Sequence, residues 1–64
     1  MKFIVEINCD NFAFENPQEL PNILRSLAQK MEDGHNVDGI KLRDTNGNIV
    51  GFSQFSDLTE EEDY

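Results

Sequence analysis

The sequence predicts an α+β fold: a β-α-β-β two-layer sandwich in which one helix packs on a three-stranded, mostly antiparallel sheet. Three features predict it. A segment near the N-terminus alternates apolar and polar residues, a central segment repeats apolar residues at helical spacing, and two further alternating segments flank a turn-rich stretch. A sheet with one apolar face and a helix with one apolar stripe have to cover each other, so the two layers share one core.

The first strand is expected over residues 2–9, where side chains alternate with a period of two. One face carries mainly apolar residues and should be buried, which would make the lone cysteine an unreactive thiol. Asp10-Asn11 should end the strand. The buried face consists of Phe3, Val5, Ile7 and Cys9, and the other face of Lys2, Glu6, Asn8 and, as an apolar exception, Ile4.

The helix is expected to begin near Asn16-Pro17, because asparagine is a good N-cap, proline fits the first helical position, and Glu19 follows three residues after the cap. Pro21 removes one early hydrogen bond and could move the regular start closer to itself. Gly34 is a suitable residue for a left-handed cap at the other end. The apolar stripe between them consists of Leu20, Ile23, Leu24, Leu27, Ala28 and Met31.

Residues 44–48 contain the turn of a hairpin, and two loop lengths fit them. A two-residue loop would place Lys41 and Arg43 opposite apolar residues of the next strand. A three-residue loop over residues 45–47, with Gly47 in the left-handed conformation, keeps the apolar residues together on one face. We expect the second register, because a slip by one residue would reverse every side chain. It pairs Leu42 with Val50 and Ile40 with Phe52.

Two strand orders are compatible with these elements. We favour the third strand in the centre, antiparallel to both neighbours; the alternative places the first strand beside the second through a right-handed crossover. Residues 1–56 are expected to form this single domain, and residues 57–64 an acidic tail. A chain of 64 residues buries only a small core, so docking onto a partner or self-association would add stability.

The charge is unevenly distributed along the chain. Thirteen acidic and five basic residues give a net charge of −8, and residues 57–64 hold five acids and no base, which leaves −3 for residues 1–56. Direct nucleic-acid binding is disfavoured, because it requires a positive face. The tail is then either a solvated end or an acidic nucleic-acid mimic that blocks a basic partner.

No catalytic, cofactor-binding or metal-binding residues are expected, and we predict that the protein is not an enzyme. One cysteine and one histidine do not fill a tetrahedral metal site, and His35 lies in a polar connection. The polar residues of the turn lack the spacing of a calcium loop. No segment approaches about 18 consecutive apolar residues, and the start of the chain is too polar for a signal peptide, so we expect a cytoplasmic protein without membrane contact.

Two groups of residues are candidates for partner contacts. Phe12 and Phe14 precede the helix, where they either close the end of the core or expose one ring as an aromatic anchor. The second group lies on the sheet face away from the helix, which no other part of the chain is expected to cover. It consists of Ile4, Glu6, Lys41, Arg43 and Ile49, and it is either a solvated face or a contact surface.

Several segments resemble a family of very small phage and mobile-element proteins. They are Asp10-Asn11, Phe14-Glu15, Asn16-Pro17, the stripe over residues 23–28 and, most specifically, the hairpin over residues 38–51 with its run LRDTNGNIVG. The resemblance covers about residues 1–52, and the acidic tail departs from it. No activity is attributed to that family, so the resemblance implies no site residues. It implies a phage protein in the host cytoplasm that acts by binding.

The sequence therefore predicts a non-enzymatic, phage-type protein-binding module that acts as an inhibitor or adaptor on a host or phage protein. Two alternatives stay open. One is a self-assembling, homodimeric structural protein that pairs through exposed strand edges. The other is the acidic nucleic-acid mimic described above.

Overall fold

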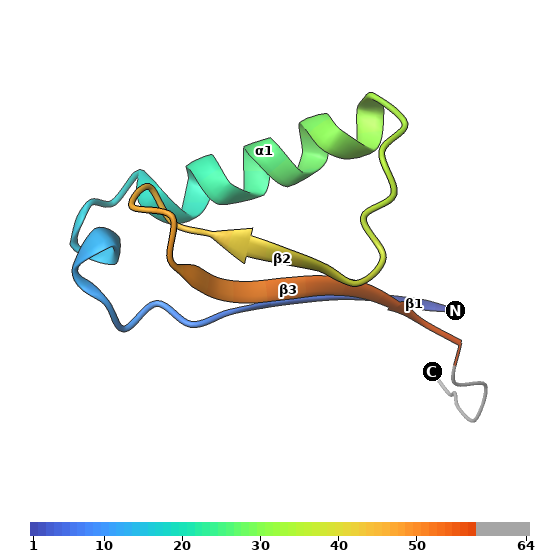
Figure 1. Ribbon diagram of the computed structural model, residues 1–64, viewed down its shortest axis with the longest axis horizontal. Coiled ribbons are helices and arrows are strands. Elements are labelled where there is room, and N and C mark those ends of the chain that lie inside the picture. Colours follow the sequence, from blue (N-terminus) through green and yellow to red (C-terminus); the bar gives the residue numbers. More distant parts are fainter. Residues whose placement is uncertain (58–64) are drawn as a thin grey trace.

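Five elements make up the part of the chain that the structure describes, residues 1–57 of a computed structural model. Strand β3 is the centre of the sheet and pairs antiparallel with both neighbours, in the order β1-β3-β2 (Figure 1). The α+β sandwich and the favoured strand order are thus confirmed. The elements are β1 (Lys2–Ile7), the 3-10 helix η1 (Phe12–Glu15), α1 (Glu19–Glu32), β2 (Ile40–Arg43) and β3 (Ile49–Ser56).

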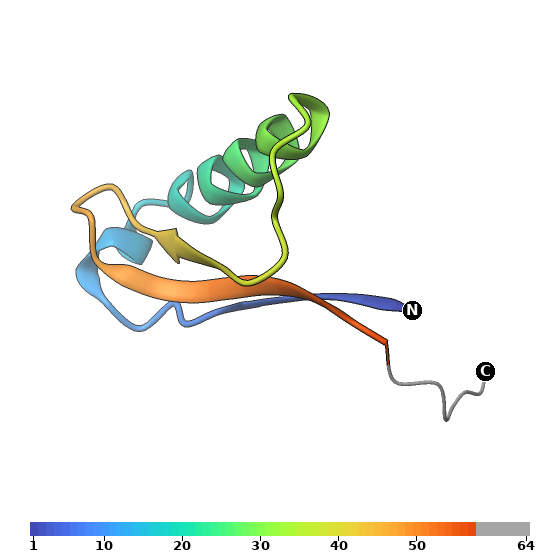
Figure 2. The same ribbon diagram turned by 45° about the vertical axis from the view of Figure 1, so that its right-hand side comes forward.

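Helix α1 covers one face of the sheet, and none of the described segments covers the opposite face (Figures 1 and 2). The core lies between the two layers. Its buried apolar residues are Ile23, Leu27, Val37, Leu42 and Val50, and the partly buried Phe3, Ile7, Phe14 and Ile40 pack against them. Five buried apolar side chains within residues 1–57 make a small core, as expected for so short a chain.

Strand β1 ends at Ile7, two residues earlier than predicted, and this corrects the expectation for Cys9. The side-chain oxygen of Asn8 accepts a hydrogen bond from the backbone N–H of Asp10 (2.9 Å), which turns the chain away from the strand direction. Cys9 is therefore exposed and does not belong to the buried face. The prediction of a buried thiol was wrong because a local side-chain hydrogen bond replaces the next step of the ladder.

The regular helix begins at Glu19, two residues after Pro17. Asn16 caps the turn that leads into it: its side-chain oxygen accepts a hydrogen bond from the N–H of Gln18 (2.9 Å), and its carbonyl accepts one from the N–H of Glu19 (3.0 Å). Pro21 then lies in the first helical turn, where its missing N–H would have no partner within the helix. The start is shifted from the prediction, but Asn16 and Pro21 are both accommodated.

Gly34 ends the helix in the predicted way. Its φ is 85°, a left-handed conformation that glycine adopts without a steric penalty. The N–H of Gly34 donates to the carbonyl of Met31 (3.1 Å), and the N–H of His35 donates to the carbonyl of Lys30 (3.0 Å). These bonds satisfy carbonyls that the last turn would otherwise leave without donors.

The predicted three-residue loop of the hairpin is confirmed. Gly47 has a φ of 86°, and the N–H of Asp44 donates to the carbonyl of Asn48 (2.9 Å), which closes the loop over residues 45–47. Arg43 and Ile49 form the first pair of the ladder beyond it.

The predicted register beyond that pair is wrong, because a β-bulge at Val50 shifts the ladder by one residue. The observed pairs are Leu42 with Gly51, Lys41 with Phe52, and Ile40 with Ser53. A shift of one residue reverses all the side chains that follow. Phe52 therefore leaves the core side and lies on the face away from α1.

Two small residues of β3 favour the bulged register. Gly51 lies so close to β1 that a Cβ atom there would collide with the backbone carbonyl of Glu6. Ser53 takes the inward position that Phe52 was predicted to occupy. It is fully buried, and its hydroxyl donates to the carbonyl of Val37 (2.7 Å). The close approach of β1 thus requires a glycine at position 51, and Ser53 fills a fully buried position beside Val37.

A buried carboxylate organises the hairpin loop. Asp44 is 6% exposed and accepts four hydrogen bonds: from the N–H groups of Asn46 and Asn48 (both 2.9 Å) and from the side-chain amides of Asn11 (2.8 Å) and Asn48 (3.2 Å). Burial alone would raise the pKa of Asp44, but these hydrogen bonds outweigh it and lower the pKa below its ordinary value of 3.8. Because Asn11 is one of the donors, the segment before η1 is held against the hairpin loop.

A second buried carboxylate joins the loop to the helix. Glu19, the first residue of α1, is 4% exposed, and its side chain accepts a hydrogen bond from the N–H of Thr45 (2.8 Å). The helix start, η1 and the hairpin loop therefore meet at one end of the molecule, which fixes the strands relative to the helix.

Candidate protein-binding face

The open face is the sheet surface opposite α1, and the strand register defines its members. Side chains alternate along a strand, so Lys41 and Arg43 point away from the core that contains Leu42. Their partners across the ladder point the same way. The open face consists of Lys2, Ile4, Glu6, Lys41, Arg43, Ile49, Phe52, Gln54 and Ser56.

Phe52 occupies the centre of the open face. It pairs with Glu6 of β1 on one side and with Lys41 of β2 on the other, so an aromatic ring stands between an acidic and a basic residue. Phe52 is partly buried, whereas Glu6 and Lys41 are exposed. Phe52 was predicted to lie in the core, so it was not among the residues predicted for partner contacts. The signal that could have found it is Gly51, because a glycine inside a strand often marks a bulge or a close backbone approach.

The five residues predicted for this face all lie on it, but its two isoleucines are not neighbours. Ile4 is partly buried opposite Gln54, and Ile49 is 54% exposed opposite Arg43. The row that contains Phe52 lies between the two isoleucines, so Phe52 joins them into one apolar strip. Arg43 donates a hydrogen bond to the carbonyl of Gly47 (2.9 Å), which holds its guanidinium near the hairpin loop.

A hollow of about 650 Å³ lies at the end of the open face nearest η1. Polar groups from the segment after β1 form one wall, and β3 with Lys41 forms the other. The lining residues are Asn8, Asp10, Asn11, Lys41, Ile49, Val50, Gly51 and Phe52. The hollow therefore continues the open face toward the loop that Asn11 and Asp44 hold together.

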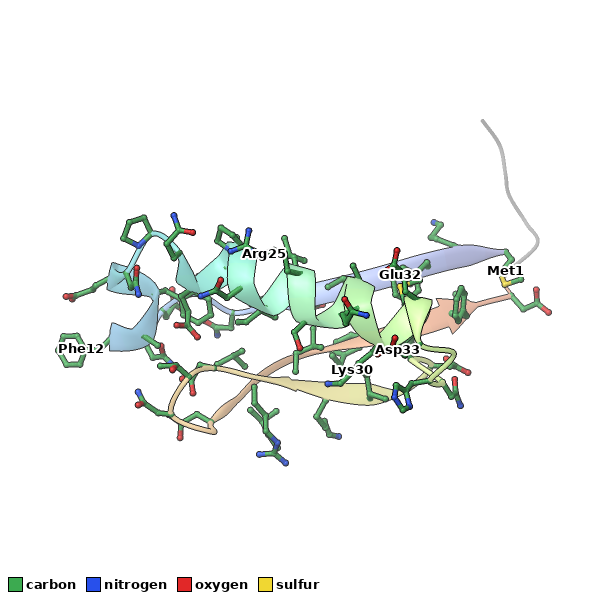
Figure 3. All side chains as sticks on the ribbon, turned by 90° about the horizontal axis from the view of Figure 1, so that it is seen from above. Met1, Phe12, Arg25, Lys30, Glu32 and Asp33 are labelled. Carbon is green, nitrogen blue, oxygen red and sulfur yellow. The ribbon has the colours of Figure 1, made fainter. Side chains whose placement is uncertain are left out.

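The two phenylalanines before the helix have different environments. Phe14 is partly buried and packs against the core, whereas Phe12 is 83% exposed. Figure 3 shows Phe12 projecting from the end of the molecule. Asn11 fixes the start of η1, because its side-chain oxygen accepts a hydrogen bond from the N–H of Ala13 (2.9 Å). Phe14 is thus the ring that closes the end of the core, and Phe12 is the ring that is exposed as a candidate aromatic anchor.

The residues that could take part in catalysis or metal binding are dispersed over the molecule. Cys9 follows β1 and His35 follows α1, and these two connections lie at opposite ends of the molecule (Figure 1). Within residues 1–57, no three His, Cys, Asp or Glu side chains come together in a way that could hold a metal ion. None of the helices in the same part of the chain is long and apolar enough to cross a membrane.

The acidic tail that the sequence analysis singled out lies almost entirely outside the described residues, which end at Asp57. The nucleic-acid mimic depends on that tail and stays a prediction. Comparison with protein-family models, with curated proteins and with solved structures finds no match to this chain. The resemblance to small phage proteins therefore also stays a prediction.

Proposed function

We propose that the protein is a non-enzymatic binding module whose open face docks onto one protein partner, as an inhibitor or adaptor does. The observation that carries the proposal is the position of Phe52. An aromatic side chain stands at the centre of a sheet face that the described chain leaves uncovered, between Glu6 and Lys41.

The composition of the open face supports this proposal. Aromatic and aliphatic side chains at the centre, surrounded by charged groups, are typical of protein–protein interfaces. Here Phe52 and the exposed Ile49 supply the apolar centre, and Glu6, Lys41 and Arg43 supply the charges. Phe12 adds a second aromatic anchor beyond the hollow.

The same residues indicate the chemistry of the partner. A complementary surface would offer an apolar site for Phe52 and Ile49, acidic groups beside Lys41 and Arg43, and a basic group beside Glu6. Because both charge signs occur within the face, the expected partner is a mixed protein surface rather than a uniformly charged one. The resemblance to small phage proteins supports a host protein as this partner and the host cytoplasm as the location.

The test compares Lys41→Glu with Lys30→Glu. Both lysines are exposed and both substitutions reverse one charge, but Lys30 lies on α1, away from the open face (Figure 3). The partner is first isolated from host lysate with the wild-type chain, and its affinity for each variant is then measured by titration calorimetry. We expect Lys41→Glu to weaken binding by about tenfold or more and Lys30→Glu by less than about twofold.

Phe52→Thr is the second variant, because threonine keeps the strand preference and removes the ring. It should weaken binding at least as much as Lys41→Glu. If Lys41→Glu and Phe52→Thr bind like Lys30→Glu while circular dichroism shows an intact fold, the open face is not the docking surface.

A further inference from the structure

The outer edge of β1 has the features of a second interface. β1 is the outermost strand in the order β1-β3-β2, so one of its edges has no neighbour among the described residues. The N–H of Asn8 donates to the carbonyl of Val50 (2.7 Å), and antiparallel strands alternate the direction of their backbone groups. The even-numbered residues of β1 therefore bond to β3. The backbone groups of Phe3, Val5 and Ile7 point to the free edge.

We propose that a second copy of this chain pairs with this edge, β1 against β1, antiparallel across a two-fold axis that passes between the two Ile4 residues. The two three-stranded sheets would join into one continuous sheet. The inference is independent of the proposed open-face partner, because it needs only the chain itself.

The charges on β1 select this register. Within one chain, Lys2 and Glu6 are exposed and about 13 Å apart along the strand, too far to pair with each other. A two-fold at Ile4 places Lys2 of each copy directly opposite Glu6 of the other, so two ion pairs form. A two-fold at Lys2 or at Glu6 would instead place like charges opposite each other, which is destabilising.

The neighbouring registers also fit less well. A two-fold at Phe3 would place Lys2 opposite an isoleucine, and a two-fold at Val5 would place it opposite an asparagine. Charged residues on an edge strand commonly prevent pairing with other chains. Among two-folds at residues 2 to 6, only the one at Ile4 places both charged residues opposite a charge of the other sign, so the pattern Lys-x-Ile-x-Glu is self-complementary.

Helix α1 leaves an apolar flank uncovered beside its buried row of Ile23 and Leu27. The flank consists of Leu20 (38% exposed), Leu24 (43%) and Met31 (44%). Figure 3 shows Lys30 and Asp33 on the side of β2, and Arg25 and Glu32 on the side of β1. At helical spacing the flank lies between the buried row and Arg25 with Glu32, so it lies on the side of β1.

The proposed dimer would cover this flank. A two-fold that is perpendicular to the sheet keeps both helices on the same face, so the flank of each helix would approach the β1 strand of the other copy. Val5 lies on that face of β1 and is 36% exposed. Edge pairing would therefore bury apolar surface of α1 and β1, which favours association. It would also give hydrogen-bond partners to the backbone groups of the free β1 edge.

Charge-reversal variants test the register. The dissociation constant of the dimer is measured by sedimentation equilibrium for the wild type, Lys2→Glu, Glu6→Lys and the double variant that carries both changes. Each single variant should weaken the dimer by about tenfold or more, since it replaces both ion pairs by like-charge pairs. The double variant should regain wild-type affinity, and it is a matched control because its net charge equals that of the wild type. An equimolar mixture of the two single variants should also associate.

Cysteine cross-linking tests the position of the axis, in a Cys9→Ser background. Two Ile4→Cys residues facing each other at the two-fold would have Cα atoms about 4.5 Å apart, within reach of a disulfide. Lys2→Cys should not cross-link, because its symmetry mate would lie about 14 Å away. A chain that stays monomeric at every concentration overturns the proposal. So does a dimer that ignores the charge reversals, or one that cross-links Lys2→Cys as readily as Ile4→Cys.

Discussion

Replacing Gly51 by alanine should destabilise the domain by about 1–3 kcal/mol, the usual effect of forcing extra atoms into a packed site. An added Cβ atom would collide with the carbonyl oxygen of Glu6, and it would lie 2.9 Å from that carbonyl carbon and 3.0 Å from the Cα atom of Ile7. All three are backbone atoms, so no side-chain rotation relieves the contact. The strands β1 and β3 have to move apart instead.

This loss is large for so small a domain. At about 0.05–0.15 kcal/mol per residue, a chain of this length has a free energy of unfolding of roughly 3–10 kcal/mol. At about 4–8 °C per kcal/mol, the midpoint of thermal unfolding should fall by roughly 4–24 °C. Urea titration and thermal unfolding, both followed by circular dichroism, measure the two quantities.

The matched control is Gly34→Ala, which adds a Cβ atom where nothing lies within 4 Å. It should cost about 1–2 kcal/mol through its positive φ alone, without effect on the sheet. Hydrogen exchange separates the two variants: only Gly51→Ala should lower the protection of the β1 amides that bond to β3. Unchanged stability and unchanged β1 protection in Gly51→Ala would refute the argument that the close approach of β1 requires glycine.

Three further variants test the core and the loop. Leu27→Ala should lower the free energy of unfolding by about 2–5 kcal/mol in urea titration, because Leu27 is a buried core residue. Ser53→Ala should lower it by about 1–2 kcal/mol, because the buried carbonyl of Val37 loses its hydroxyl donor. Asp44→Asn should be less stable than the wild type at neutral pH. The folded-state pKa of Asp44 is lowered, so its ionised form stabilises the protein above pH 3.8, and this contribution is lost as the pH falls further. The stability difference between Asp44→Asn and the wild type should therefore narrow in acid unfolding experiments below pH 3.8; a difference that stays constant would contradict this linkage.

The features that the sequence predicts correctly depend on short-range constraints. Gly34 and Gly47 both have a positive φ, and the loop over residues 45–47 closes as its turn residues require. The apolar stripe of α1 likewise predicts the buried helix residues Ile23 and Leu27. In each case the deciding interaction lies within a few residues of the chain, or in a pattern that runs along a whole element.

The errors have a different physical origin. Ile49 and Val50 fit two registers equally well, and the approach of β1 to Gly51 and the buried position of Ser53 favour the observed one. The contact between Gly51 and β1 joins residues more than forty positions apart in the chain, so the local pattern does not contain it. The error at Cys9 is local, since the hydrogen bond between Asn8 and Asp10 competes with an apparently regular alternation.

The bulge at Val50 links the fold to both proposed interfaces. It exchanges an aromatic residue for Ser53 on the core side, and so it places Phe52 at the centre of the open face. With Ser53 in place of Phe52, the core beneath α1 contains a smaller side chain. The flank of Leu20, Leu24 and Met31 stays accessible beside β1. In the predicted register without the bulge, Phe52 would have lain on the core side of the sheet. The sequence instead has Gly51 and Ser53 in β3, and both residues favour the bulge. The charges on the β1 edge fit the proposed pairing with a second copy. The bulge thus takes an aromatic side chain from the core side and adds it to the open face, which supports the proposal that this face binds a partner.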